Sequence, residues 1–363
     1  MGWERKRGKL AEFNRLLRGA ADTSFIASYG DLSVLQSIRY VITLDSDTQL
    51  PLETGRRLVG TLAHPLNRPR FDERLGRVTE GYGVLQPRVG VDVVSGSRTA
   101  FAKVFSGHVG VDPYTTAVSD IYQDLFHEGS YVGKGIYDVD AFDAALANRV
   151  PENALLSHDL FEGVYARAGL CTDVHLIDDY PPQYLAFAAR QHRWVRGDWQ
   201  IVRWLWRTVP DAARRPVPNS LPIIARWKIL DNLRRSLLPI ALVGLLASGW
   251  TILPGSALCW TVVALLVLAF PAYVQVARSL GSRVRGVRIR DHIAAERDNL
   301  VTSARQSFLS ATFLAHQAWL MADAISRTLW RLLISRRHRL AWNVGNTAQL
   351  RRRGTLLPNA RRA

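Results

Sequence analysis

The chain has 363 residues, enough for one large domain or two ordinary ones, with a formal net charge of +16 and a pI of about 10.5. This basic excess favours a phosphorylated ligand, an anionic lipid surface or a nucleic acid as partner. The two cysteines, Cys171 and Cys259, are far apart and match no metal spacing, so neither a disulfide framework nor a cysteine metal site is expected.

A basic helix is the first predicted element, from Glu4 to Gly19, with Gly19 as its C-cap. Backbone N–H groups around Arg7-Gly8-Lys9, together with Lys9 itself and the downstream Asn14, have the makeup of a diphosphate site at a helix start. A solvated basic helix face explains the same residues. Taken alone, the segment favours that simpler interpretation.

The stretch Tyr40–Leu50, YVITLDSDTQL, is the one around which we expect the chain to be organised. Its apolar, β-branched start predicts a buried, parallel strand from Tyr40 to Leu44, followed at its carboxyl end by Asp45 and Asp47. Ligands bind at that edge of open α/β sheets. Two adjacent carboxylates repel each other and lose hydration there, which indicates a bound cation or a hydrogen-bond donor.

Three interpretations of this Asp-x-Asp remain open from the residues alone. The first is a solvated turn. The second is an aspartyl-phosphate phosphatase, with Asp45 as nucleophile. The third is a nucleotide-sugar site, with a cation bridging Asp47 and a diphosphate. An EF-hand loop is excluded, because Leu50 occupies the position that requires glycine and Pro51 follows it.

The next predicted elements are a helix over Pro51–His64, stopped by Pro65, and a strand over Val84–Val93, in which Pro87 indicates a bend or an edge position. A glycine-rich loop follows within residues 126–142. Its glycines let the backbone approach a ligand closely, and they are Gly129, Gly133 and Gly135. After the loop, Asp138 and Asp140 alternate with apolar residues, which is a strand pattern. A helix is predicted to begin near Ala141.

Two further segments carry candidate chemistry. Ser157 is a predicted N-cap that places Asp159 in the first turn of a helix, with Glu162 one turn later. Asp159 is then a general base aimed from a helix start, or an ordinary acid favoured by the helix dipole. Arg190–Gln200 holds three arginines and two tryptophans, which suit an anionic leaving group beside a stacked sugar or base. Single-stranded nucleic acid is bound by the same residue types.

The second half of the chain predicts a membrane region. Residues 236–277 contain no charged side chain, and each half approaches the roughly twenty residues that cross a bilayer. Arginines on both flanks predict a helical hairpin with both ends cytoplasmic. A buried pair of soluble helices is the alternative. From Asp298 to Leu340 a long helical pattern with one basic face favours a helix in the headgroup plane over a third span at 308–334.

These patterns predict five parts. We expect an α/β domain with the candidate site over residues 1–215, an amphipathic interfacial segment over 216–235 and a two-helix transmembrane hairpin over 236–277. Cytoplasmic or interfacial amphipathic helices are expected over 278–345, and a basic tail over 346–363.

In this order the motifs resemble those of processive GT-A glycosyltransferases such as cellulose and hyaluronan synthases. The local sequence over residues 4–345 is similar to that of the glycosyltransferase region of bacterial cyclic β-1,2-glucan synthases. The matching stretches are Glu-Gly-Ser-x-x-Gly-Lys-Gly-Ile-Tyr-Asp-Val-Asp, Trp-x-Arg-Gly-Asp-Trp-Gln and His-Gln-Ala-Trp-Leu-Met-Ala-Asp-Ala. Several motifs in one order are more specific than any single one, and they argue against the phosphatase. The uncharged stretch over residues 236–277 argues against a single-stranded nucleic acid as the partner of Arg190–Gln200.

The resemblance implies a fold and a set of roles. The fold is an α/β GT-A-like domain, a Rossmann-type mixed sheet incomplete at its N-terminus, followed by an α-helical membrane region. Asp45 and Asp47 hold a divalent cation, Mg²⁺ or Mn²⁺, and Asp159 is the catalytic base. The donor diphosphate is bound by Lys9, Asp45, Asp47, Arg193 and Arg196. The acceptor is bound by Gly129, Ser130, Trp194, Asp198 and Trp199.

The chain departs from the family pattern at two positions. Arg190 stands where the broader family has Gln, and His158 stands where it has an acid. The segment that would bind the uracil base ahead of Glu4 is also missing, so we expect an N-terminally incomplete piece of a larger synthase.

The resemblance further implies transfer of glucose from UDP-glucose to a growing β-1,2-glucan. The catalytic domain would be cytoplasmic, on a multi-pass protein of the bacterial inner membrane whose partners are the lipid bilayer and the rest of the synthase. Alternatives are a synthase of another linkage, an inactive membrane remnant, and a membrane protein that binds anionic lipid or nucleic acid.

Overall fold

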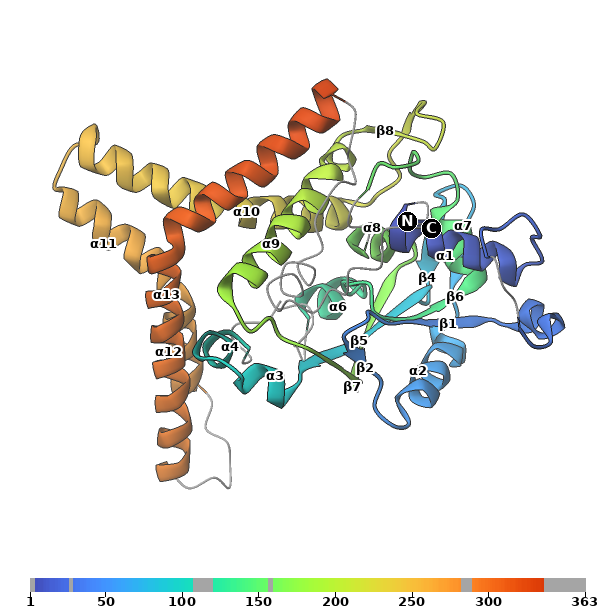
Figure 1. The fold of residues 1–363 in the computed structure, drawn as a ribbon, viewed down its shortest axis with the longest axis horizontal. Helices are drawn as coiled ribbons and strands as arrows, with labels where there is room; N and C mark the ends of the chain where they lie inside the picture. Colours follow the sequence, from blue (N-terminus) through green and yellow to red (C-terminus); the bar gives the residue numbers. More distant parts are fainter. Residues whose placement is uncertain (1–3, 26–28, 107–119, 156–158, 282–288, 336–363) are drawn as a thin grey trace, which may run out of the picture.

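The computed structural model describes residues 4–25, 29–106, 120–155, 159–281 and 289–335. A mixed α/β part occupies one side of the molecule and an array of long helices the other (Figure 1). The central sheet of the described residues has the strand order β1-β6-β5-β7-β2. These strands are β1 Tyr40–Thr43, β2 Thr48–Gln49, β5 Val84–Val91, β6 Gly135–Asp138 and β7 Ala168–Asp178. Two small two-stranded sheets accompany it, formed by β3 Arg70–Asp72 with β4 Arg77–Glu80, and by β8 Thr208–Pro210 with β9 Pro216–Pro218.

The sheet is mixed, as predicted, but the first strand does not pair as predicted. β1 runs antiparallel to β6 at one edge of the described sheet, and Tyr40, Val41 and Ile42 are only half-buried. The expectation of a buried, parallel strand is therefore wrong. The uninterrupted apolar run has another cause. Val41 packs against the larger hydrophobic core on one face, while Tyr40 and Ile42 pack against a smaller core on the other. Because both faces are covered, the hydrophobic alternation of a one-sided strand is lost.

β5 lies in the middle of the sheet, antiparallel to β6 and parallel to β7. Pro87 is therefore not at an edge. Instead the pairing with β7 shifts register between Pro87 and Arg88, which is the bend that the proline indicated.

Helices cover both faces of the sheet. Successive residues of the paired strands β5 and β6 therefore point into two different hydrophobic cores. Leu85 and Ile136 face the smaller core, which is closed by α2, Thr54–Ala63. Val84 and Tyr137 face the larger core. That core is closed by α1 Arg5–Leu17, α7 Val139–Leu146 and α8 Asp159–Tyr165. The remaining short helices of this part are α3 Val93–Ser97, α4 Ala100–Phe105 and α6 Ile121–Phe126.

Several predicted elements are confirmed with small shifts. α1 ends one residue before its C-cap Arg18, and Gly19 follows with a φ of +86°, a backbone conformation that favours glycine. α2 begins at Thr54 and stops at Ala63, ahead of Pro65. α7 begins at Val139 because the Asp138 side chain accepts a hydrogen bond from the Ala141 N–H and so caps the helix.

The helical array consists of α9 Tyr184–Gln200, α10 Ile223–Thr251, α11 Ala257–Leu268, α12 Phe270–Gly281 and α13 Ile289–Trp330. α13 packs against α9 and α10, with Val195 of α9 among Met321, Ala324 and Ile325 of α13. The first turns of α10 lie within residues 216–235 and belong to the protein interior, because Ala225, Ile229 and Leu233 contribute to the larger core.

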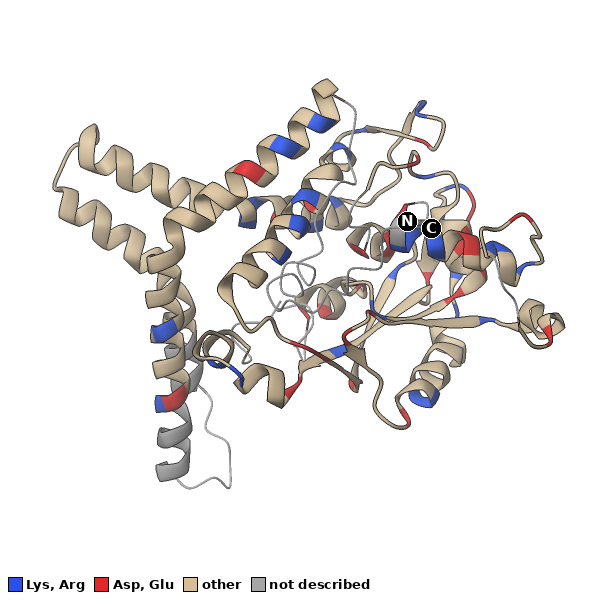
Figure 2. Cartoon of the chain, viewed as in Figure 1, with Lys and Arg blue, Asp and Glu red and all other residues tan. Residues whose placement is uncertain are grey.

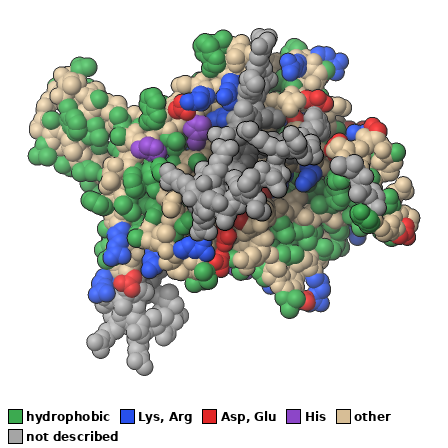
Figure 3. All heavy atoms as spheres, in the orientation of Figure 1, with side chains coloured by type: hydrophobic (Ala, Val, Ile, Leu, Met, Phe, Trp, Pro, Cys, Tyr) green, Lys and Arg blue, Asp and Glu red, His purple; other side chains and the backbone are tan. Residues whose placement is uncertain are grey.

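The predicted transmembrane hairpin is not supported. Residues 236–277 are divided among α10, α11 and α12, with breaks after Thr251 and at Ala269. Within the described ranges, no helix combines the length and the apolar character that crossing a membrane requires. α11 has only 12 residues, and the first half of α10 carries charged side chains. The hairpin of α10 and α11 nevertheless projects from the body and shows no charged residue beyond the first turns of α10 (Figure 2). Apolar side chains gather over it (Figure 3).

Candidate active site

The site is built around Asp45, which follows β1. The Lys6 ammonium of α1 donates to Asp45 Oδ1 at 2.9 Å and to the Gly133 carbonyl at 2.6 Å. Lys134 Nζ lies 3.3 Å from Asp45 Oδ2. Burial would raise the pKa of Asp45, but the two lysines outweigh it and hold that pKa below its ordinary value. Asp45 is therefore a fixed carboxylate with a cation on each oxygen.

Lys134 connects Asp45 to the far edge of the sheet. Its ammonium is buried and forms an ion pair with Asp178 at the end of β7. Asp178 Oδ1 in turn accepts a hydrogen bond of 2.6 Å from the Thr48 hydroxyl of β2. The chain of charges Lys6–Asp45–Lys134–Asp178 thus runs across the end of the sheet, from α1 to β7. Such a satisfied polar network fixes the positions of its members.

The loop that precedes β6 is held against this network. The Tyr131 hydroxyl and Thr43 Oγ1 lie 2.8 Å apart, and the Val132 N–H donates to Gln86 Oε1 at 2.9 Å. Gly133 follows with a φ of +86°. The loop is pinned on both sides of its turn.

Asp159, at the first position of α8, packs directly against Gly133. A Cβ atom at Gly133 would lie 2.6 Å from Asp159 Oδ1, so only glycine leaves room for the carboxylate. The pKa of Lys6 also reflects the nearness of Asp159 to the site. Burial tends to lower the pKa of Lys6, but Asp45, Asp159 and Glu162 outweigh it and raise that pKa. Ser157 and His158, the predicted cap and the unusual family position, lie outside the described residues.

Arg193 of α9 is a further cation near these acids. Burial, followed by the neighbouring Arg190, lowers the pKa of Arg193, while Asp45, Asp159 and Asp47 act in the opposite direction. Each of the three predicted acids therefore lies within electrostatic reach of Arg193, although these residues come from three distant segments of the chain. The hydrogen bond from Lys6 to Asp45, the packing of Asp159 against Gly133 and the electrostatics of Arg193 thus bring α1, α8 and α9 to the end of β1.

The chain is related over nearly its whole length to part of a larger enzyme. It is 44% identical over 362 residues to the cyclic beta-(1,2)-glucan synthase NdvB of Rhizobium meliloti (strain 1021), and the match covers 98% of the chain. The chain is a homologue of one segment of that synthase. It spans only 12% of the length of this curated relative. No protein-family model matches the chain. The resemblance to cyclic β-1,2-glucan synthases drawn from the motifs is confirmed.

The residues predicted from the synthase motif on α9 lie in different surroundings. Trp194 is 37% exposed, and the Arg190 guanidinium lies 4.7 Å from the centre of its ring. Arg196 is buried. Trp199 Nε1 donates to Ser236 Oγ of α10 at 2.9 Å, so this indole joins two helices. Asp198 accepts a hydrogen bond of 3.5 Å from the Asn232 amide, also on α10. Trp194 is thus the aromatic side chain of this motif that offers a surface to a ligand.

Gly129 and Ser130, predicted to bind the acceptor, are buried. Lys228 of α10 holds this part of the loop, donating to the carbonyls of Glu128 at 2.9 Å and Gly129 at 2.8 Å. Burial lowers the pKa of Lys228 to about 8. The loop is therefore tied to the helical array as well as to the sheet.

The two residues of α1 that were predicted to form a diphosphate site, Lys9 and Asn14, do not contact Asp45 in the described structure. Lys9 is exposed on α1, whereas Lys6, one turn earlier, reaches Asp45. Asn14 is buried and accepts a hydrogen bond of 2.7 Å from the Tyr137 hydroxyl, so it anchors α1 to β6. Sequence reasoning missed Lys6, and it gave Lys134 and Asp178 no role. Asp178 carried a usable signal, since it ends a strand parallel to β5 at the edge where ligands bind.

The described side chains provide too few oxygen ligands to hold a divalent cation alone, so a bound diphosphate would have to supply the others. Among the described residues, no group of three or more His, Cys, Asp or Glu side chains could hold a metal ion. Both oxygens of Asp45 face lysines. Asp47 is half-exposed, and the described part of the chain places no hydrogen bond or ion pair on its carboxylate. With the oxygens of a bound diphosphate, Asp47 would complete a hard-cation site of the kind that Mg²⁺ and Mn²⁺ occupy.

Proposed function

We propose that the chain is the sugar-transferring part of a cyclic β-1,2-glucan synthase, which moves glucose from UDP-glucose to the 2-hydroxyl of a growing glucan with inversion at the anomeric carbon. The observations that carry the proposal are the packing of Asp159 against Gly133, whose carbonyl is bound by the same Lys6 that pairs with Asp45, and the electrostatic reach of all three acids to Arg193. The identity to a named glucan synthase supports the sugar and the linkage.

Asp159 is the base in this proposal. Its carboxylate sits at the first position of α8 with Gly133 packed beneath it, so its position is set by a helix and a pinned loop. As the acceptor oxygen attacks the anomeric carbon, its proton passes to Asp159 and the bond from that carbon to the diphosphate oxygen breaks. UDP leaves with the electron pair of that bond, and the glucan is one residue longer.

Lys6 and Arg193 stabilise the departing diphosphate. Both are cations within reach of the acids, and electrostatic stabilisation of developing charge is usually the largest catalytic contribution. Trp194, which is 37% exposed and has the Arg190 guanidinium over its ring, is the proposed stacking surface for the acceptor sugar. A divalent cation, held by Asp47 with Asp45 nearby, would supply Lewis-acid neutralisation of the diphosphate when bound.

UDP release from sugar nucleotides tests the proposal. We expect membranes carrying the full-length protein to release UDP from UDP-glucose in a divalent-cation-dependent way, and to yield a glucan that a β-1,2-specific hydrolase degrades. A product with another linkage would favour a cellulose- or hyaluronan-type synthase. Absence of UDP release both from this chain and from the full-length protein would make it an inactive remnant.

A lipid bilayer is a further proposed partner. The support is the row of exposed apolar side chains on α11, with Leu258, Leu265 and Leu266 between 49% and 70% exposed. Sedimentation with phospholipid vesicles tests this. Charged substitutions at these three leucines should release the chain into the supernatant, whereas unchanged sedimentation would contradict the proposal.

A further inference from the structure

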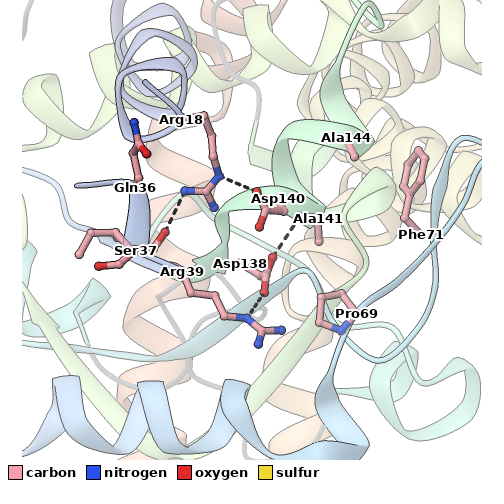
Figure 4. A pocket seen from close by; sticks show the side chains of 11 residues that line it. Arg18, Gln36, Ser37, Arg39, Pro69, Phe71, Asp138, Asp140, Ala141 and Ala144 are labelled. Carbon is pink, nitrogen blue, oxygen red and sulfur yellow. Dashed lines mark hydrogen bonds and ion pairs between the residues drawn. The ribbon is translucent and has the colours of Figure 1, made fainter. Parts of the chain in front are cut away.

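A cavity lies at the opposite end of β1 from Asp45. It has a volume of about 590 Å³, which falls within the range of small-molecule sites. Its walls come from the end of α1, the segment before β1, the approach to β3, and the start of α7 (Figure 4). The four residues of β1 separate it from the catalytic acids by about 13 Å at the usual strand rise. No residue used in the proposed transfer lines it.

Two ion pairs line this cavity. Arg18 Nε lies 2.7 Å from Asp140 Oδ1, and Arg39 Nε lies 3.0 Å from Asp138 Oδ2. The lining therefore holds two cations and two anions, and its formal charge is zero in a chain of net charge +16. A phosphate would meet two carboxylates here and an ammonium two guanidinium groups. The balance disfavours both and suits a neutral, polar ligand.

The charged groups are held in place by contacts with the backbone. Arg18 also donates to the Ile38 carbonyl at 3.0 Å, and Asp138 accepts from the Ala141 N–H at 3.1 Å as the cap of α7. Parts of the pairs remain accessible, since the side chains of Arg39 and Asp140 are 51% and 72% exposed. The cavity thus presents both N–H donors and carboxylate acceptors from a rigid frame.

An apolar wall faces these polar groups. Phe71 and Pro69 lie on one side of the cavity, and Ala144 of α7 lies beside them (Figure 4). Apolar side chains opposite paired donors and acceptors match a sugar ring, which has C–H faces and a rim of hydroxyl groups that both donate and accept.

We propose that this cavity binds a neutral glucan segment, at a site separate from the one that performs the transfer. The proposal rests on the proposed function, because the product of that reaction supplies the ligand. A site on the same rigid sheet would hold an earlier part of the growing chain while its end is extended. It would raise the effective concentration of that end at the catalytic acids.

Hydrogen–deuterium exchange of the full chain, with a linear β-1,2-glucooligosaccharide as probe, tests this proposal locally. We expect the oligosaccharide to slow exchange in peptides that cover residues 36–39 and 138–144. Two variants should require an oligosaccharide concentration about tenfold higher, or more, for the same protection. One is Gln36→Ala combined with Arg39→Ala, which removes polar contacts. The other is Ala144→Phe, which fills the cavity. Arg56→Ala is the matched control. Arg56 is a surface arginine of α2 that pairs with Glu53, and it does not line the cavity.

Each other outcome overturns the proposal. No protection of these peptides in the wild-type chain would remove the cavity as a glucan site, while UDP release from UDP-glucose would still decide the transfer reaction. Protection that persists unchanged in both cavity variants would place the oligosaccharide elsewhere. Equal protection by inorganic phosphate would show an anion site instead of a site for a neutral sugar.

Discussion

Replacing Gly133 by alanine is the substitution whose effect the structure defines most closely. Two costs follow from geometry. An alanine at a φ of +86° is strained by about 1–2 kcal/mol. Its Cβ would also lie 2.6 Å from Asp159 Oδ1, whereas ordinary contacts begin at 3.4 Å, so the carboxylate must move by about 0.8 Å. Displacement of a catalytic group on that scale reduces turnover by about a hundredfold. We expect kcat for UDP release to fall by that factor with little change in KM for UDP-glucose.

Gly30→Ala is the matched control for the backbone strain. Gly30 has a φ of +90° and nothing within 4 Å of its added Cβ, so this variant carries the strain without a collision. Both variants should lose about 1–2 kcal/mol of unfolding free energy in urea titrations, and only Gly133→Ala should lose turnover. A Gly133→Ala enzyme with wild-type kcat would refute the placement of Asp159 against this glycine and its role as base. Equal losses of kcat in both variants would attribute the effect to strain alone.

Three further predictions follow from the site. Lys6→Met removes the cation hydrogen-bonded to Asp45 and should lower kcat at least about tenfold in UDP-release assays, whereas Lys9→Met should not; equal effects would contradict this assignment. Because burial lowers the pKa of Lys228 from 10.5 to about 8, the unfolded chain binds more protons between these values and stability rises with pH. Urea unfolding should therefore show the wild type gaining about 3 kcal/mol relative to Lys228→Met from pH 7 to pH 10.5, and parallel pH profiles would disprove it. Chelation should abolish turnover, and Asp47→Asn should raise the Mg²⁺ or Mn²⁺ concentration for half-maximal rate at least about tenfold; an unchanged concentration would exclude Asp47 as a ligand.

The chain's local signals predicted local structure well. The helix over residues 5–17 ends just before a glycine with positive φ, and the helix predicted near Ala141 begins two residues earlier, at Val139. These features depend on a few neighbouring residues, so the sequence carries them directly. The convergence of Asp45, Asp47, Asp159 and Arg193 was expected from the order of motifs, and the structure brings these four side chains within electrostatic reach.

Features that depend on distant contacts were not accessible in the same way. The apolar run of β1 suggested a parallel strand, but the run reflects cores on both faces and says nothing about strand direction. The choice between Lys6 and Lys9 depends on how α1 is rotated against the sheet, which a basic helix pattern does not specify. The uncharged composition of residues 236–277 suggested two spans, but it did not show that the helices end after Thr251 and at Ala269.

The central claim is that Asp159 is the base of a glucosyl transfer whose donor site is formed by Asp45, Asp47 and Arg193. Its most direct test compares the full-length wild-type protein with Asp159→Asn, measuring UDP-glucose binding and UDP release on the same preparations. We predict unchanged UDP-glucose binding and a loss of UDP release of at least about a hundredfold in the variant. Wild-type UDP release by Asp159→Asn would contradict the account.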